Sequence, residues 1–456
     1  MELLSRIQFA FTISFHILYP AFSIGLITFI AFFELIWLNT KKKIYLQICK
    51  FWTKILALTF GMGIVSGIVM EFQLGTNWSN YTKMSGNVLG VLFTYEVLTA
   101  FFIEAGFLGV MFFGWNRVGP KLHFAATLLA LFGVTLSAFW IMSANSWMQF
   151  PTGVAFSDNV FTVQSWLDTI FNPLFLPRFF HMLIATYIST LLVIIAICAY
   201  YILKQKSLAF AKTCFSVAFL ALIILIPLQI ALGDLVGVRV LKYQPIKTAA
   251  IEGLWETQKG APLLLFAIPD QTNEINHFEI GIPKLASLIN THKLEGELVG
   301  LKSVSPADRP FVPAVFYSFR VMVGLWVVML LMVMTGIFLY FFKTVFNTKW
   351  YLRCCIFVAP IGFISIITGW FTAEFGRQPW VIYHYLKTSA AHSDIQLQNV
   401  IISLVSIIVV YGIIFGYFYF RYFFKIIKAG LDDTLFTTEQ TFFYLSPSTA
   451  ELNKEP

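Results

Sequence analysis

The sequence has little charge for its length. Of 456 residues only 12% are Asp, Glu, Lys or Arg, while 58% are hydrophobic and 18% are aromatic. A soluble globular protein averages about 25% charged and about 45–50% apolar residues, and a disordered chain is poor in aromatic residues. So few charges could not cover this much apolar surface in water. The composition therefore excludes a soluble enzyme and a disordered protein, and it predicts an integral membrane protein.

Cysteine is also scarce, and its placement excludes two further kinds of structure. The five cysteines lie in or beside apolar runs and include no CxxC pair: Cys49, Cys198, Cys214, Cys354 and Cys355. Paired spacing is what indicates a disulfide framework or a zinc site in a sequence. Neither is expected here.

Long apolar runs make up most of the chain. A helix needs about 20 mostly apolar residues to cross a bilayer, and nine segments meet that requirement: 10–38, 52–73, 90–113, 122–146, 179–203, 212–233, 314–342, 354–373 and 398–424. The first run is too long for the core of a signal peptide, and no small-residue cleavage site follows it. We therefore predict an all-α integral membrane protein with nine transmembrane helices.

Lysine and arginine are unequally distributed between the two sides of these helices. Sixteen lie in or beside the connections on one side, from Lys41 to Lys428, whereas the N-terminus and the short connections on the other side hold five. The positive-inside rule then places the N-terminus outside and the C-terminus in the cytoplasm. Most of the formal net charge of +8 is thus explained by topology, and we expect no nucleic-acid partner.

The predicted helices divide the chain into four segments. Helices 1–6 occupy residues 1–233, a polar outer loop occupies 234–313, helices 7–9 occupy 314–428, and a short cytoplasmic tail occupies 429–456. Connections as long as the outer loop usually carry function or form a small domain.

Ionisable side chains within the membrane are few, and each marks a functional site by default because burying a charge there is costly. With the predicted orientation most of them lie in the outer half of the bilayer, and Met322 lies there too: His16, Glu71, Glu96, His181, Arg320 and Glu374. Glu104 lies about 12 Å deeper than Glu96, at about 1.5 Å per helical residue. Glu34 and His123 fall at cytoplasmic helix ends, where we expect water to reach them.

This outer cluster permits two functional interpretations. Histidine and methionine are common axial ligands of haem iron, which favours a redox enzyme. Intramembrane carboxylates also suit a proton- or ion-coupled secondary transporter. Taken singly, each residue could equally be a packing or hydrogen-bonding side chain, so composition and position leave both interpretations open.

Ordered sequence motifs favour the first interpretation. MEFQLGTNWSNY (70–81), SANSWMQFP (143–151), KTAAIEGLWETQ (247–258) and GWFTAEFGRQPW (369–380) resemble subunit I of the cytochrome bd-type quinol oxidases, and the resemblance covers nearly the whole chain. It implies a terminal oxidase of the bacterial cytoplasmic (inner) membrane. Such an enzyme oxidises quinol at the outer face, reduces dioxygen to water, and builds a proton gradient without pumping.

The resemblance also implies three cofactors: a low-spin haem b, a high-spin haem b, and a haem d or a third b haem in its place. It makes His181 and Met322 the axial ligands of the low-spin haem. The remaining implied roles are ligation of the high-spin pair by His16, Glu96 and Glu374, pairing with haem propionates by Arg320 and Arg377, and an inter-haem position for Trp370.

Substrate, proton and partner assignments follow from the same resemblance. Lys247 and Glu252 are the expected quinol-binding residues, and Glu104, Glu96 and Ser137 form the expected inward proton route. The outer loop resembles the short quinol-loop form, and the role of its second half is not specified by that resemblance. The implied partners are a homologous subunit II and a small single-span subunit, with quinol and dioxygen as substrates.

Overall fold

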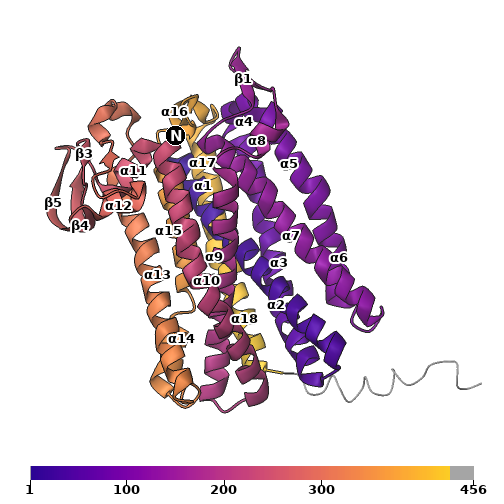
Figure 1. Ribbon diagram of the computed structural model, residues 1–456. Helices are drawn as coiled ribbons and strands as arrows, with labels where there is room; N and C mark the ends of the chain where they lie inside the picture. Colours follow the sequence, from indigo (N-terminus) through magenta and orange to yellow (C-terminus); the bar gives the residue numbers. More distant parts are fainter. Residues whose placement is uncertain (1, 432–456) are drawn as a thin grey trace, which may run out of the picture.

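In a computed structural model, apolar helices run side by side along one axis and the polar connections gather mainly at one end (Figure 1). The structure describes residues 2–431. Within these residues nine helical segments are long and apolar enough to cross a membrane: Glu2–Thr40, Lys43–Thr76, Ser79–Phe113, Pro120–Gln149, Phe175–Leu203, Leu208–Tyr243, Val312–Phe341, Lys349–Phe375 and Leu397–Ala429. The prediction of a nine-helix membrane protein is confirmed. Of the predicted tail 429–456, residues 432–456 lie outside the described part.

Five of these segments are single α-helices: α3 (Lys43–Thr76), α7 (Pro120–Gln149), α9 (Phe175–Leu203), α10 (Leu208–Tyr243) and α13 (Val312–Phe341). The sixth predicted span ends at residue 233, but α10 continues to Tyr243. Nearly three helical turns at its end, at about 3.6 residues per turn, therefore lie in the range predicted as outer loop.

Proline interrupts the first and eighth segments. Helices α1 (Glu2–His16) and α2 (Leu18–Thr40) meet at Ile17, because Pro20 has no amide hydrogen to donate to the carbonyl of His16. Helices α14 (Lys349–Phe357) and α15 (Ile361–Phe375) are likewise separated by a turn that contains Pro360. The first break leaves His16 at the end of a helix.

The third and ninth segments contain π-helical stretches. The third consists of α4 (Ser79–Ser85), η1 (Gly86–Gly90), α5 (Val91–Glu96), η2 (Val97–Phe101) and α6 (Phe102–Phe113). The ninth consists of α17 (Leu397–Ile407), η5 (Ile408–Phe415) and α18 (Gly416–Ala429). Short π segments inside helices are frequent at functional sites, and Glu96 stands between the two in the third segment.

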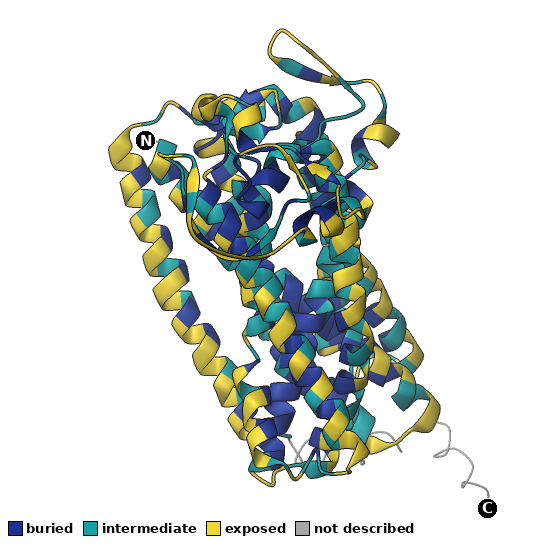
Figure 2. Ribbon diagram, turned by 60° about the vertical axis from the view of Figure 1, so that its left-hand side comes forward, coloured by how far each residue is buried: buried dark blue, intermediate teal, exposed yellow. Residues whose placement is uncertain are grey.

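The core lies between α2 and α9. In the most apolar window of the first and fifth segments 67% of the residues are buried, against 17–28% in the other seven, and Figure 2 shows the buried residues along the middle of the bundle. The largest cluster includes Leu26, Trp52, Ile195 and Phe215. The other helices surround these two and expose apolar side chains outward, as helices facing lipid or partner subunits do.

The polar end carries short strands and helices that the sequence did not predict. The strands pair only two by two and antiparallel: β1 (Val154–Ser157) with β2 (Val160–Val163), β3 (Gln258–Lys259) with β6 (Glu297–Leu298), β4 (Leu263–Asp270) with β5 (Ile275–Ile282), and β7 (Trp380–Ile382) with β8 (Leu386–Lys387). The short helices are α8 (Trp166–Ile170), α11 (Pro245–Glu252), α12 (Leu285–Thr291) and α16 (Thr388–Ala391). Two 3₁₀ turns, Leu301–Ser303 and Pro306–Asp308, complete the long connection.

Gly336 allows α13 to pack closely on its neighbours, and its replacement by valine tests that packing. A β-carbon at Gly336 would lie 2.2 Å from the hydroxyl of Tyr351 and 2.5 Å from the ring of Phe219. We expect Gly336→Val to destabilise the protein by about 1–3 kcal/mol, the usual cost of overpacking. This loss would be measured as a lower thermal unfolding midpoint in detergent. Gly324→Val is the control, because a β-carbon at Gly324 would have no neighbouring atom within 4 Å; an equal loss there would show that close packing is not the cause.

Candidate functional site

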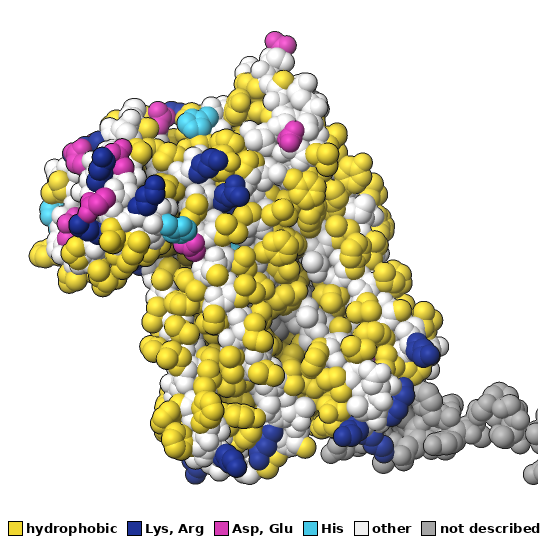
Figure 3. Space-filling model, viewed as in Figure 1, with side chains coloured by type: hydrophobic (Ala, Val, Ile, Leu, Met, Phe, Trp, Pro, Cys, Tyr) yellow, Lys and Arg dark blue, Asp and Glu magenta, His cyan; other side chains and the backbone are white. Residues whose placement is uncertain are grey.

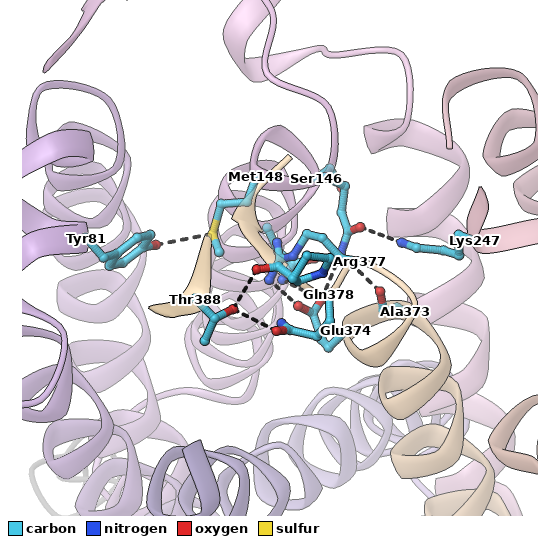
Figure 4. Close-up of polar contacts among 12 residues, drawn as sticks. Tyr81, Ser146, Met148, Lys247, Ala373, Glu374, Arg377, Gln378 and Thr388 are labelled. Carbon is cyan, nitrogen blue, oxygen red and sulfur yellow. Dashed lines mark hydrogen bonds and ion pairs between the residues drawn. The ribbon is translucent and has the colours of Figure 1, made fainter. Parts of the chain in front are cut away.

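A carboxylate near the end of α15 is the centre of a polar cluster built from several elements. Glu374 Oε1 accepts hydrogen bonds from Asn145 Nδ2 at 3.1 Å and Gln149 Nε2 at 3.0 Å, both on α7. Its other oxygen pairs with Arg377, and Figure 4 shows Lys247 reaching from α11 toward the side of the cluster that holds Glu374 and Arg377. Elements far apart in the sequence thus hold Glu374 in one position.

Basic side chains outnumber carboxylates in this cluster, and its two arginines alone exceed the single carboxylate of Glu374. Arg178, on α9, donates to Asn145 Oδ1 at 2.6 Å and to Ser146 Oγ at 2.8 Å, and Lys247 Nζ donates to Gln149 Oε1 at 2.5 Å. Arg377 Nε and Nη1 are buried and have no partner among the described residues. Buried charges require partners, so the cluster is suited to receive a further anionic group.

Lys247 is buried, and its environment disfavours the charged amine. Burial lowers the pKa of Lys247 well below its ordinary value, and the nearby guanidinium groups of Arg178 and Arg377 lower it further, while Glu374 opposes them. The unfolded chain therefore holds a proton on this amine at pH values where the folded chain has released it.

Lys247→Met is expected to change stability and activity in opposite directions. Methionine fills the same space without an amine, and Gln149 Oε1 keeps its bond from Gln244 Nε2 at 3.2 Å. The wild type should gain stability, by up to about 1.4 kcal/mol per pH unit, as pH rises from the lowered pKa toward 10.5. The variant should lack this increase, match or exceed the wild type near neutral pH, and lose quinol oxidation. Unfolding midpoints of wild type, Lys247→Met and the exposed control Lys242→Met test this; a persistent slope in Lys247→Met would assign the increase to another group.

Glu252, on the same short helix, points to different partners. The two residues are about 140° apart around a helix at about 100° per residue. Glu252 Oε1 accepts a hydrogen bond from Asn290 Nδ2 at 2.8 Å, and its buried Oε2 has no partner among the described residues. Burial raises the pKa of Glu252, while the Asn290 bond and the charge of Arg320 oppose that rise. The structure therefore does not bring Lys247 and Glu252 together at one point.

Arg320 ties the long connection to α13. Its Nε donates to the carbonyl of Leu264 at 2.8 Å and its Nη1 to the carbonyl of Ile251 at 2.7 Å, while the buried Nη2 lacks a partner among the described residues. Arg320 thus has one donor left for a ligand at the boundary between loop and membrane helix.

A cavity of about 100 Å³ adjoins Lys247 between α11, the end of the long connection and the segment after α15. Its polar and aromatic lining includes Lys247, Asp308, Gln378, Trp380 and His384. The cavity could hold a small ring or a few water molecules beside the buried amine.

Each of the predicted haem-ligating His and Met side chains has a glycine beside its reactive end. A β-carbon at Gly67 would lie 3.1 Å from His16 Cε1, one at Gly233 would lie 3.3 Å from His181 Cε1, and one at Gly369 would lie 2.9 Å from Met322 Sδ. These glycines leave the three side chains room that a larger residue would remove.

Polar neighbours orient the two histidines. His16 Nδ1 is 3.0 Å from Ser66 Oγ, and His181 Nε2 is 3.3 Å from Gln229 Nε2, whereas His181 Nδ1 is buried without a partner among the described residues. No three His, Cys, Asp or Glu side chains of the described chain gather around one point. The five predicted iron ligands are thus spread over the site and form no single cluster.

The predicted proton-route residues line the contact between the third segment and α7. Ser137 Oγ donates to Glu96 Oε1 at 2.6 Å. A β-carbon at Gly133 would lie 2.9 Å from the backbone nitrogen of Glu104, so the two helices touch at that level. Glu71 is exposed on the described surface.

The expectation that water reaches Glu34 and His123 is wrong. Their exposures are 0% and 1%, and His123 Nδ1 lies 2.6 Å from Glu34 Oε1. Thr127 donates to the second carboxylate oxygen at 2.7 Å, and the Trp115 ring covers the imidazole at 3.8 Å. The packing of α2, α7 and the segment after α6 keeps water from Glu34 and His123, although both residues lie near helix ends.

Several site residues have no conspicuous signal in the sequence, because they are neutral amides or ordinary charges of a loop. Asn145, Gln149 and Gln244 carry no charge and so do not stand out in a membrane segment, although Gln149 and Gln244 are 1% and 0% exposed. Arg178 stood out only as one basic residue of an outer connection. Asn145 and Gln149 both lie within the motif SANSWMQFP (143–151), which is the one indication of them in the sequence.

The described residues thus form nine helices able to cross a membrane around a buried polar site rich in arginine, which defines a multi-pass membrane protein with a site for an anionic group. The family model for cytochrome bd terminal oxidase subunit I matches residues 4–431, and the chain belongs to this family. It is therefore a subunit of a terminal quinol oxidase of a bacterial membrane, whose family implies haem cofactors, and the transporter alternative is excluded.

Individual relatives agree with that assignment over almost the whole chain. The chain is 33% identical to cytochrome bd-II ubiquinol oxidase subunit 1 of Escherichia coli (strain K12), covering 90% of this chain and 93% of the relative. It is 34% identical to cytochrome bd ubiquinol oxidase subunit 1 of Bacillus subtilis (strain 168), covering 94% of each. A solved chain of the bd oxidase from Geobacillus thermodenitrificans superposes with a TM-score of 0.86 at 25% identity, over 94% of this chain and 98% of that one.

Proposed function

We propose that this chain oxidises quinol at its loop end and reduces dioxygen to water in the same half of the membrane, generating a proton gradient without pumping. The observation that carries the proposal is the cluster around Glu374, where Lys247 from the loop donates to Gln149 and Gln149 in turn donates to Glu374, the partner of Arg377. The cluster thereby links the loop end of the protein, where quinol would bind, to the interior of the helix bundle.

The residues present fit haem groups. Unpartnered buried donors of Arg320 and Arg377 suit propionates, which the guanidinium fork binds well. In this proposal His181 and Met322 hold a low-spin haem b. His16, Glu96 and Glu374 would hold the high-spin haem b and the haem d, or a third b haem in its place, and Trp370 would take the inter-haem role. Bound haems would supply one-electron transfer and a site for dioxygen.

Quinol oxidation releases protons, and Glu252 is placed to accept one. Its Oε2 is free of partners among the described residues and burial raises its pKa, which makes a carboxylate a better base near neutral pH. Lys247, whose neutral amine is favoured, would hold a quinol oxygen from the side of the cavity. The protons would then leave at the loop end.

Protons for water formation would enter from the opposite side. Glu104 lies deeper in the membrane than the bonded pair Glu96 and Ser137, and the three would carry protons toward the dioxygen site. The unequal Lys and Arg distribution favours an N-terminus outside, and Figure 3 shows basic residues at the far end of the bundle. In that orientation the protons released by quinol and the protons consumed in water formation stay on opposite sides of the membrane. This separation alone builds the gradient.

The assembly would include further components. The family implies a second, homologous subunit, and we propose a small single-span subunit in addition. The exposed apolar surfaces of the outer helices leave room for both, in the bacterial cytoplasmic (inner) membrane.

Asn290→Ala tests whether the second half of the loop serves quinol oxidation. Removing the 2.8 Å bond should raise the pKa of Glu252 further, so the acidic limb of the pH–rate profile should move to higher pH. The quinol kcat/KM should fall roughly tenfold, the value of one bond to a charged group. The exposed neighbour Ile289→Ala should behave as wild type, and Asn290→Ala should add nothing in a Glu252→Gln background. Additive losses would show that Asn290 acts elsewhere.

Oxygen consumption by the purified complex tests the proposed function as a whole. A quinol should drive it, and Lys247→Met and Glu252→Gln should each slow it while leaving oxygen consumption with a donor that bypasses the loop unchanged. Absence of quinol-driven consumption in a fully haem-loaded complex would overturn the proposal.

A further inference from the structure

The β4–β5 hairpin of the long connection exposes an apolar surface that the proposed chemistry does not use. Its large side chains lie open on the described surface: Leu265 (55% exposed), Phe266 (46%), Ile268 (43%), Phe278 (77%), Ile280 (62%) and Ile282 (43%). Phe266 pairs across the strands with Ile280, and Leu263 with Ile282. The two members of each cross-strand pair lie side by side on one face, and exposed apolar patches mark contacts with a membrane or another molecule.

The backbone itself turns one of these side chains outward. Phe278 has a φ of +54°, a left-handed conformation that a bulky residue rarely adopts. The register of the two strands shifts between Phe266 and Ile268, next to this residue. A strained conformation that exposes a phenylalanine is best explained by a surface that receives the ring.

Hydrogen bonds fix the level of the hairpin along α13. Tyr317 Oη donates to the carbonyl of Ala267 at 2.9 Å, and Arg320 Nε donates to the carbonyl of Leu264 at 2.8 Å. These residues lie five and eight positions after the start of α13 at Val312, or about 8–12 Å along it. A 30-residue helix is about 45 Å long and the hydrocarbon core about 30 Å thick. The hairpin therefore lies near the boundary between headgroups and hydrocarbon.

The apolar surface continues onto the membrane-facing side of α13. Val321, Val327 and Val328, further along α13, are 44%, 42% and 41% exposed. The loop's ion pairs include Lys302 with Glu256 and Lys284 with Glu295, and Figure 3 shows its charged side chains above an apolar underside. A charged side toward water and an apolar side toward the bilayer is the pattern of an interfacial segment.

We propose that the β4–β5 hairpin rests in the lipid headgroup region of the leaflet at the loop end of the bundle, with Phe278 and Ile280 inserted at the top of the acyl chains. The hairpin would anchor the long connection to the bilayer and hold β4 against Tyr317 and Arg320. This anchoring does not depend on the identity of the electron donor or of the haems.

Quenching by labelled lipids tests the position. The complex, with exposed Cys354 replaced by serine, would carry a bimane label at Phe278→Cys or, as a second variant, at Ile280→Cys. It would be placed in phosphatidylethanolamine–phosphatidylglycerol nanodiscs with nitroxides on shallow or deep acyl positions. Thr272→Cys, in the exposed turn of the same hairpin, is the control. Comparing nanodiscs with and without nitroxide cancels any quenching by haem.

Shallow nitroxides should quench both hairpin labels at least twofold more than deep nitroxides, and should leave the Thr272→Cys label nearly unchanged. Unquenched, red-shifted emission from both hairpin labels would place the hairpin in water, and unquenched, blue-shifted emission would place it under another protein. Either result overturns the proposal. If only one of the two hairpin labels is quenched as expected, the result would support insertion of the hairpin and would show which of the two residues inserts.

Discussion

Glu374→Gln is expected to lower quinol-driven oxygen consumption by roughly a hundredfold or more and to destabilise the protein by about 1–3 kcal/mol, the usual cost of leaving a buried polar partner unsatisfied. Glu374 is the carboxylate that Arg377 pairs with and that Asn145 and Gln149 hold. Without its charge Arg178 and Arg377 would remain buried beside a neutral amide. Thermal unfolding and oxygen consumption of the purified complex measure the two losses.

A matched carboxylate and a second substitution control this result. Glu279→Gln removes an exposed carboxylate from the loop and should change neither quantity. Lys247→Met should restore part of the stability in the Glu374→Gln background, because neighbouring sites in one network are not additive. Full stability of Glu374→Gln on its own would contradict the account of the buried charges.

Glu104→Gln is expected to slow oxygen reduction by roughly 10²–10³-fold, within the range of one lost proton-transfer group, and to reduce the proton release outside in step. Its backbone abuts Gly133 of α7, on the helix that carries Ser137, so a neutral amide would interrupt the proposed route between the cytoplasm and Glu96. Haem content should stay near that of the wild type. Oxygen consumption and external acidification in proteoliposomes give both rates.

Glu34→Gln is the control for the loss of a buried carboxylate. Glu34 is 0% exposed and bonded to His123 and Thr127, and it has no place on the proposed route. The variant should be less stable yet turn over normally per folded enzyme. If it slows turnover as much as Glu104→Gln does, the route has been placed wrongly.

The helices were predictable because their cause is local. Apolar runs of about 20 residues have few alternatives to a membrane helix, and all nine are present. Their bounds and interruptions depend on single residues and on neighbours: Pro20 breaks the first segment, and α10 continues past the apolar run to Tyr243. The strand pairs of the loop end were not predicted, because two-residue strands such as β3 and β6 leave no alternation to detect.

The site was predictable only where charge made residues conspicuous. Glu374 and Arg320 stood out because charges within the membrane are costly. Asn145 and Gln149 did not, because a neutral amide costs less to bury than a charge, and Asn290 lies 38 residues from the Glu252 it bonds. Whether Glu34 and His123 meet water depended on the packing around them, which the sequence does not display.

A reduced-minus-oxidised visible absorption spectrum of the purified complex tests the central claim, that the outer half of this bundle holds haems on the named residues. We predict haem bands in the wild type, with the low-spin b component lost in both His181→Ala and Met322→Leu while the other bands remain. A colourless protein, or low-spin bands that survive both substitutions, would contradict the account.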